Sequence, residues 1–272
     1  MDPRAIEEFV GRDWQQAAAA KGAYWADRFR GEWRSTWDAS QALLVHALRT
    51  RAPFASEPER ATDLAAHVAL RERLDRAGDA RSPVVDLLAD LAAALDELGV
   101  AWFLFGAQAA ILHGAARLTA DVDVTVRLPE TMSNEALTEQ LERFRFRSRF
   151  VDPEFTKRTS VIPFVHTPTS LPLDTVLAGP GLEERFFKRL ELRDIDGVRV
   201  PLASPEDLVI MKVLAGRPKD LEDTTAILAA YGDRLDRRYM ETTFAELEQA
   251  LSQSDLVPAF RSAVAAAERW RR

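Results

Sequence analysis

Two aspartates one residue apart are the side chains of this chain best suited to chemistry. Asp121 and Asp123 alternate with three valines in the sequence DVDVTV at positions 121–126. Because side chains along a β-strand point to alternate faces, this pattern predicts a strand that carries both carboxylates on one face. Two carboxylates this close repel each other unless a cation lies between them, and Mg²⁺ prefers oxygen ligands. The pattern therefore predicts a magnesium site, with an ordinary solvated strand face as the alternative.

Composition narrows the classes of protein and of site. The 272-residue chain is 47% hydrophobic and 29% charged, with four histidines and no cysteine, which is typical of a globular protein. The absence of cysteine excludes disulfides, thiolate nucleophiles and Cys-ligated zinc. A net charge of -7 gives no overall attraction to nucleic acid, so such a partner would need a local basic patch.

The sequence shows no feature of a membrane or secreted protein. No apolar run is long enough to span a bilayer, and the acidic residues near the N-terminus do not suit a secretory signal. We therefore expect a cytoplasmic protein with no membrane partner.

Residues 1–80 are expected to form a helical N-terminal region. Four of the six tryptophans lie there, at spacings that keep them near one face of a helix: Trp14, Trp25, Trp33 and Trp37. We expect this stripe to pack against the rest of the chain or against a partner. The less favoured alternative is that these tryptophans stack on unpaired bases of a nucleic acid, beside Arg28, Arg30 and Arg34.

Residues 81–203 carry signals of alternating helix and strand. Ser82-Pro83 predicts the start of a helix that ends at Gly99 and leads into a buried strand over Val100–Phe105. A small-residue turn at Gly106-Ala107 and a short helix over Gln108–His113 then precede the aspartate strand. Later signals predict a helix over 134–144, strands over 161–165 and 171–177, and a hairpin turn at Asp196-Gly197.

Residues 204–272 are expected to form a helical C-terminal region. Its start is marked by Ser204-Pro205 followed by acidic residues, and its breaks by Gly216-Arg217-Pro218 and Gly232. The whole pattern predicts an α+β fold, with a small mixed, mainly antiparallel sheet between helical additions at both ends.

The segment GAQAAILHGAARLTADVDVTV at 106–126 resembles the nucleotidyltransferase fold of the DNA polymerase beta superfamily, whose signature is a Gly-Ser or Gly-Gly turn followed by Asp-x-Asp. It is similar in particular to nucleotidyltransferase-like toxins of the AbiEii and MenT type and to related uncharacterised bacterial proteins, in which Arg-x-Thr/Ser precedes Asp-x-Asp, as Arg117-Leu118-Thr119 does here. Three further elements follow in the same order: Asp174 in LPLDTVL, Lys212 in DLVIMK, and RPKDLED at 217–223. The resemblance covers residues 82–231.

This resemblance implies that Asp121, Asp123 and Asp174 hold one or two Mg²⁺ ions, for which Mn²⁺ could substitute. Asp174 would complete the metal site or act as a base toward the acceptor. The resemblance also implies contact with the nucleotide for Gly106, Ala107, Arg117, Thr119, Lys212, Lys219, Asp220 and Asp223.

Each implied nucleotide contact has a structural alternative. Lys212 could instead extend from an apolar helix to solvent, and Lys219, Asp220 and Asp223 could form the charged first turn of a helix. Arg117 could pair with a carboxylate. Ala107 departs from the family pattern, because many members have serine there, so only backbone amides remain for a phosphate.

Two other features near the motif have less specific signals. His113 is expected to be a packed, hydrogen-bonded histidine rather than a ligand. Four arginines alternate with phenylalanines over 143–150, which predicts a half-exposed helix end and strand: Arg143, Arg145, Arg147 and Arg149. The alternative is a basic ridge that guides an RNA acceptor.

The function implied by the resemblance is Mg²⁺-dependent transfer of a nucleoside monophosphate from an NTP to a hydroxyl of tRNA or of a protein. The implied setting is a toxin–antitoxin or phage-defence system, with a cognate antitoxin or other partner protein. Two alternatives stay open. One is a non-catalytic binding or antitoxin module of the same fold, and the other is an aminoglycoside-type small-molecule nucleotidyltransferase, whose cationic substrate would suit the acidic chain.

Overall fold

The computed structural model describes residues 12, 16–17, 19–20, 82–115, 119, 121–149 and 152–271. The tryptophans of the predicted N-terminal stripe, the arginines beside them and Arg117 lie outside these residues. Of the helical region expected over 1–80, the described residues are Arg12, which lies in a bend, and Gln16, Ala17, Ala19 and Ala20, which are helical. The division into three regions therefore stays a prediction.

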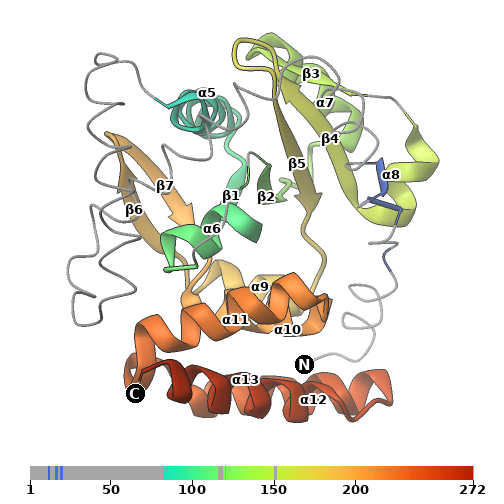
Figure 1. Ribbon diagram of the computed structural model, residues 1–272. Helices are drawn as coiled ribbons and strands as arrows, with labels where there is room; N and C mark the ends of the chain where they lie inside the picture. Colours follow the sequence, from blue (N-terminus) through green and yellow to red (C-terminus); the bar gives the residue numbers. More distant parts are fainter. Residues whose placement is uncertain are drawn as a thin grey trace.

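The described residues form one seven-stranded mixed sheet with the order β3-β4-β5-β2-β1-β7-β6 (Figure 1). Its strands are β1 Ala101–Phe105, β2 Val122–Arg127, β3 Phe146–Ser148, β4 Val161–His166, β5 Leu171–Leu177, β6 Glu191–Ile195 and β7 Val198–Leu202. The pairs β2/β5 and β1/β7 are parallel, and the other four pairs are antiparallel. The predicted α+β fold with a mainly antiparallel sheet is confirmed.

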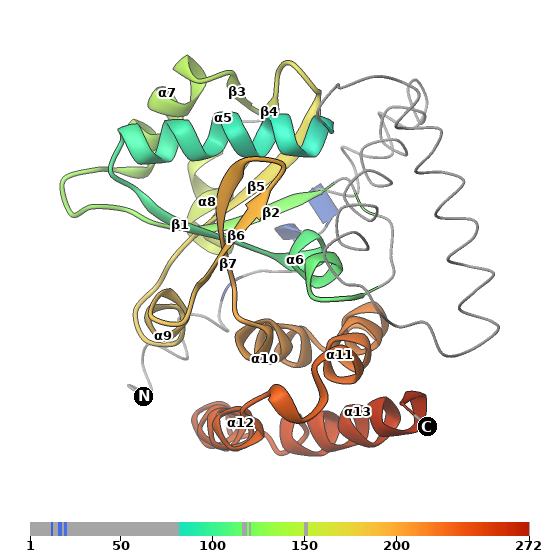
Figure 2. The same ribbon diagram turned by 90° about the vertical axis from the view of Figure 1, so that its left-hand side faces the viewer.

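The helices flank this sheet on two sides (Figure 2). Helix α5 crosses the sheet on one side, and the C-terminal helices lie together on the other. The bounds are α5 Pro83–Glu97, α6 Gly106–Leu112, α7 Asn134–Arg143, α8 Pro153–Thr159, α9 Leu182–Phe187, α10 Pro205–Ala215, α11 Pro218–Tyr231, the 3₁₀ turn η1 Gly232–Arg234, α12 Arg237–Leu251 and α13 Leu256–Trp270. None of the described helices has the length and apolar character needed to cross a membrane.

Helix α5 forms where the sequence predicts it. The Ser82 side chain accepts a hydrogen bond from the Val84 backbone N–H, and Pro83 occupies the first helical turn. The buried face includes residues at helical spacing, among them Val84, Leu87, Leu88, Leu91 and Leu95. Burial of each leucine side chain contributes about 1.5–3 kcal/mol, so the apolar stripe fixes α5 against the sheet.

Two local signals further along the chain are also confirmed. Asp196 and Gly197 both have positive φ, 49° and 83°, as a two-residue turn between β6 and β7 requires. The Ser204 side chain accepts from the Asp207 backbone N–H at the start of α10, and Gly216 ends that helix in a left-handed conformation. These signals act through neighbouring residues, so they can be read without the rest of the fold.

Two predicted boundaries near the aspartates need correction. Gly106 and Ala107, expected as a turn before a helix starting at Gln108, are themselves the first residues of α6. Strand β2 begins at Val122, so Asp121 lies one residue before the strand. A glycine with φ +71° lets the chain turn from β1 directly into a helix, which makes a separate turn unnecessary.

His113 packs inside the protein, as expected. Its ring is fully buried, with Nε2 2.8 Å from the Ala203 carbonyl oxygen and Nδ1 2.6 Å from the Tyr231 hydroxyl. Since a carbonyl only accepts, Nε2 carries the proton and Nδ1 accepts from the tyrosine. The histidine thereby joins the end of α6 to the end of β7 and to α11.

Candidate active site

Asp123 and Asp174 are brought together by the parallel pairing of β2 with β5. The register of that pair sets Asp123 directly beside Asp174. Partners on neighbouring strands lie about 4.8 Å apart and direct their side chains to the same face. Asp123 is half-buried and Asp174 is 7% exposed. Two carboxylates so placed repel each other, so positive charge nearby stabilises the pair.

Gly106 lies directly against the first of these carboxylates. A β-carbon at position 106 would lie 2.9 Å from both Cβ and Cγ of Asp123, and closer still to Oδ2. Only glycine fits here, because the close approach leaves no room for a side chain and φ is in the left-handed region. Phe105, which precedes the helix, has no side-chain acceptor for the first N–H groups of α6. The start of α6 and the Asp123 carboxylate are therefore held in contact.

A short hydrogen-bonded chain holds the segment before β2. Gln108 on α6 donates from Nε2 to the Thr119 carbonyl oxygen at 3.0 Å. The Thr119 hydroxyl accepts from the Asp121 backbone N–H at 3.2 Å. Thr119 thus positions Asp121 at the entrance to the strand, and its predicted contact with a nucleotide stays a prediction.

Lys212, Asp220 and Asp223 form a buried ionic cluster between α10 and α11. The lysine Nζ donates to Asp220 Oδ1 at 3.0 Å and to Asp223 Oδ2 at 2.6 Å. The three residues are 5%, 0% and 4% exposed. Burial alone would raise the pKa of Asp220, but the hydrogen bond from Arg217 and the charge of Lys212 lower it below the ordinary value. This geometry gives all three residues a structural role, but Lys212 is buried and does not extend to solvent as the alternative for it supposed.

Lys219 differs from this cluster because it lies in the first turn of α11 and is exposed to solvent. Its predicted contact with the nucleotide stays a prediction.

Arg217 is a second cation at the start of α11, besides Lys219, and it pairs with Asp220. Its guanidinium hydrogen-bonds Asp220, and its side chain is half-exposed. Partial burial would lower its pKa, but the bond to Asp220 and the charges of Asp220, Asp123 and Asp223 raise it instead. The charge of Asp123 therefore acts on Arg217 together with those of its two neighbours in α11. Sequence reasoning included Arg217 only as part of a motif and did not assign it to the site.

Arg149 pairs with Asp174, which sequence reasoning did not anticipate. Its Nη2 forms an ion pair with Asp174 Oδ1, and the two side chains are only 5% and 9% exposed. Arg145 instead pairs with Asp90 at 3.3 Å, and Arg147 points to solvent. The arginines therefore do not form one exposed basic ridge, because Arg149 faces the site.

The residues present fit a magnesium ion, although no preformed cluster is evident. Within the described ranges, no group of three or more His, Asp or Glu side chains is arranged to hold a metal. Mg²⁺ needs only one or two protein carboxylates, since water and substrate phosphates complete its octahedron. Asp123 and Asp174 supply hard oxygen donors side by side, and Arg149 already places positive charge beside one of them.

Residues near the N-terminus pack beside the same face of the sheet. The Arg12 guanidinium forms two hydrogen bonds with the Glu183 carboxylate, at 2.9 and 3.1 Å, and both side chains are buried. Ala17, Ala20 and Phe105 pack against a small apolar cluster of Phe155, Val161 and Val176. Val176 follows Asp174 by two residues on β5, so it shares the face of the carboxylates.

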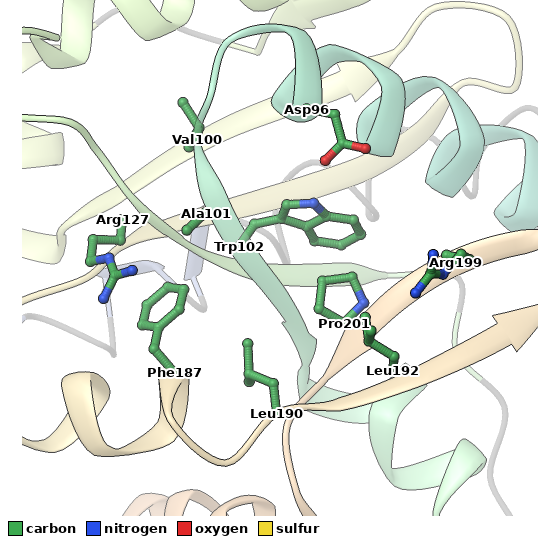
Figure 3. A pocket seen from close by; sticks show the side chains of 10 residues that line it. All are labelled: Asp96, Val100, Ala101, Trp102, Arg127, Phe187, Leu190, Leu192, Arg199 and Pro201. Carbon is green, nitrogen blue, oxygen red and sulfur yellow. The ribbon is translucent and has the colours of Figure 1, made fainter.

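A separate hollow lies at the far end of the β1/β2 pair (Figure 3). It has a volume of about 410 Å³ and is lined by Asp96, Val100, Ala101, Trp102, Arg127, Phe187, Leu190, Leu192, Arg199 and Pro201. Arg127 lies over the Phe187 ring, 4.6 Å from its centroid. Ala101 pairs with Arg127, whereas Asp123 pairs with Phe105 at the opposite end of β1. The hollow is therefore not part of the carboxylate site.

The chain matches one protein-family model and is similar to two solved structures. A family model described as "Nucleotidyltransferase of unknown function (DUF6036)" matches residues 84–267. The chain is similar to the crystal structure of an antigenic nucleotidyltransferase-like protein from Paracoccidioides brasiliensis, with 19% identity and a TM-score of 0.41 over 66% of this chain and 91% of that one. It is also similar to the solution structure of the antibiotic-resistance factor ANT(2'')-Ia, with 18% identity and a TM-score of 0.41 over 68% and 95% of the two chains. No curated protein matches the sequence.

Proposed function

Because the chain belongs to the DUF6036 family of nucleotidyltransferases, of unknown function, we propose that it transfers a nucleoside monophosphate from an NTP to an acceptor hydroxyl. The observation that carries this proposal is that Asp123 and Asp174 lie side by side on neighbouring strands, and that Gly106 lies in contact with the Asp123 side chain. Adjacent carboxylates next to a helix start are suited to a metal-bound triphosphate.

In this proposal each residue has a defined task. Asp123 and Asp174 would hold Mg²⁺, with Asp121 at the entrance to β2 as the third carboxylate. When bound, the metal would neutralise charge on the phosphates and lower the pKa of the attacking hydroxyl. The backbone amides of Gly106 and Ala107 would contact a phosphate, and Arg217 would add positive charge near Asp123.

The reaction forms one bond and breaks one. The acceptor oxygen bonds to the α-phosphorus and loses its proton, while the bond from the α-phosphorus to the bridging oxygen breaks and pyrophosphate leaves. Positioning and electrostatic stabilisation account for most of the catalysis in reactions of this type. The residues described above supply both by holding the phosphates against fixed charges.

The acceptor and the biological setting belong to the same proposal. The similarity of 106–126 to AbiEii and MenT toxins supports a tRNA or protein acceptor, and a toxin–antitoxin or phage-defence system with a cognate antitoxin as partner. The net charge of -7 supports a second candidate, a cationic small molecule such as an aminoglycoside. The two candidates differ in the acceptor and not in the chemistry at phosphorus.

The test is a transfer assay with each labelled NTP in the presence of Mg²⁺. The acceptors are total tRNA, the protein itself and a panel of aminoglycosides. We expect label in one acceptor class, and loss of that label with Asp123→Asn in a variant that unfolds at the wild-type temperature. Asp96→Asn is the matched control, since Asp96 is exposed at the far end of the sheet. If no NTP gives label in any acceptor, and if no NTP binds in a Mg²⁺-dependent way, the proposed transfer is wrong. The alternative of a non-catalytic binding module would then be favoured.

A further inference from the structure

Arg149 is held in place by the backbone as well as by its side chain. It directly follows β3, and its backbone N–H donates to the Pro163 carbonyl oxygen at 2.9 Å. Pro163 on β4 is the register partner of Asp174 on β5. Only β4 therefore lies between the backbone of Arg149 and β5, which carries the carboxylate that the guanidinium contacts. The pair does not depend on a mobile side chain at the surface.

The pair is also well shielded from water. Side-chain exposure is 5% for Arg149 and 9% for Asp174, and Asp123 adds a second negative charge on the neighbouring strand. A shielded carboxylate next to another carboxylate requires a cation, and the guanidinium meets that requirement without any metal. A divalent ion bound to Asp174 would meet the same requirement, but its own charge would repel the guanidinium.

We propose that Arg149 stands in for a divalent cation at Asp174 and competes with it, so that the protein alone binds metal weakly. The inference rests on the proposed function, since it concerns the metal of that site. When metal arrives with an NTP, the phosphate oxygens offer the displaced guanidinium a new charged partner. Arg149 would thus favour loading of the metal together with the nucleotide over loading of the metal alone.

The experiment measures Mn²⁺ binding to the full chain without nucleotide, by the loss of the free Mn²⁺ signal in electron paramagnetic resonance. Arg149→Gln and Arg149→Met remove the charge, and either variant is sufficient if the other does not fold. Arg149→Lys keeps a positive charge. Arg147→Gln is the matched control, because Arg147 lies two residues away, is exposed, and changes the net charge equally.

We expect the neutral variants to bind Mn²⁺ about tenfold more tightly or better, the scale on which a neighbouring cation changes the affinity of a carboxylate for a proton. Arg149→Lys and Arg147→Gln should bind as the wild type does. Unchanged or weaker binding in the neutral variants, with measurable binding in the wild type, would overturn the inference and leave the proposed function standing. No binding in any of the proteins would overturn the inference alone, because the proposed function is decided separately by the transfer assay and by Mg²⁺-dependent NTP binding.

Thermal unfolding supplies a second readout that does not depend on activity. In EDTA, the neutral variants should unfold at a lower temperature than the wild type, since Asp174 loses the charge of the guanidinium while it stays shielded. Mn²⁺ should then raise the unfolding temperature of these variants by more than it raises that of the wild type. Equal increments in the wild type and the neutral variants would contradict competition at Asp174.

Discussion

The backbone of Gly106 touches the carboxylate of Asp123, so that a β-carbon at position 106 would overlap the aspartate side chain. This contact joins the first residue of α6 to β2 at the point where β2 meets β5. A single substitution at 106 should therefore disturb the helix, the strand and the carboxylate together.

Gly106→Ala is expected to destabilise the protein by about 2–4 kcal/mol, because it adds overpacking to an unfavourable backbone conformation. It should also abolish nucleotide transfer, since Asp123 must move to make room. Chemical denaturation gives the free energy of unfolding, and the transfer assay gives the activity.

The control for this change is Gly99→Ala. Gly99 has a similar φ of +64°, but a β-carbon there would meet nothing within 4 Å. Gly99→Ala should lower the free energy of unfolding by about 1–2 kcal/mol, from the unfavourable backbone conformation alone. Equal losses of stability for the two variants would show that the contact with Asp123 has no energetic consequence.

Lys212→Met should cost about 3–5 kcal/mol of stability, because two buried carboxylates would lose their shared cation. Lys219→Met on the exposed start of α11 should stay within about 0.5 kcal/mol of the wild type. Urea denaturation of both variants measures this difference. A Lys212→Met protein with wild-type stability and no affinity for NTP would instead support the nucleotide contact predicted from the motif.

Mild acidification should lower the free energy of unfolding, because the buried His166 resists protonation in the folded protein. This ring is fully buried, with Nε2 2.9 Å from Asp90 and Nδ1 2.8 Å from Thr169. Burial lowers its pKa below the ordinary 6.5, although the hydrogen bond and charge of Asp90 oppose that shift. The unfolded chain therefore takes up a proton before the folded protein does. The stabilisation is complete above pH 6.5 and declines as the pH drops toward the lower pKa of the folded state.

The slope of that decline should reach at most about 1.4 kcal/mol per pH unit. Urea midpoints at pH 7.5 and pH 5.5, for the wild type and His166→Gln, measure it. The variant should lose less stability over this interval. An identical loss in both proteins would assign the acid sensitivity to other groups.

Tyr239→Phe should destabilise the joint between α10 and α12 by about 1–3 kcal/mol. The Tyr239 hydroxyl donates to Asp207 Oδ1 at 2.7 Å, and Asp207 is fully buried. Burial raises the pKa of Asp207, and the hydrogen bonds from Tyr239 and Ser204 limit that rise. Without the tyrosine hydroxyl, the pKa of Asp207 should rise further, which a carboxyl-selective NMR titration would detect.

Features that depend on neighbouring residues could be predicted from the sequence. Ser82-Pro83, Asp196-Gly197 and Ser204-Pro205 specify caps and a turn through contacts within a few positions, and each forms as expected. The alternation of Asp123 with buried valines likewise follows from strand geometry.

Features that depend on distant partners could not be predicted. Nothing local to β2 or β5 specifies that they pair in parallel, because register between distant strands follows from packing of the whole sheet. The alternation of arginine and phenylalanine over 143–150 predicted a half-exposed helix end and strand, but it did not indicate that Arg149 pairs with Asp174 on another strand. Lys212 could be placed on a helix, whereas its two carboxylate partners come from the next helix.

The parallel pairing of β2 with β5 also decides when a newly synthesised chain acquires its carboxylate pair. Antiparallel neighbours can pair through a hairpin as soon as both leave the ribosome, but parallel neighbours need a crossover between them. Here β2 must wait while α7, β3, α8 and β4 are made, and Arg217 emerges later still. A nascent chain therefore carries Asp123 without its partner, so the charges that would handle a nucleotide are assembled only when most of the protein has been translated.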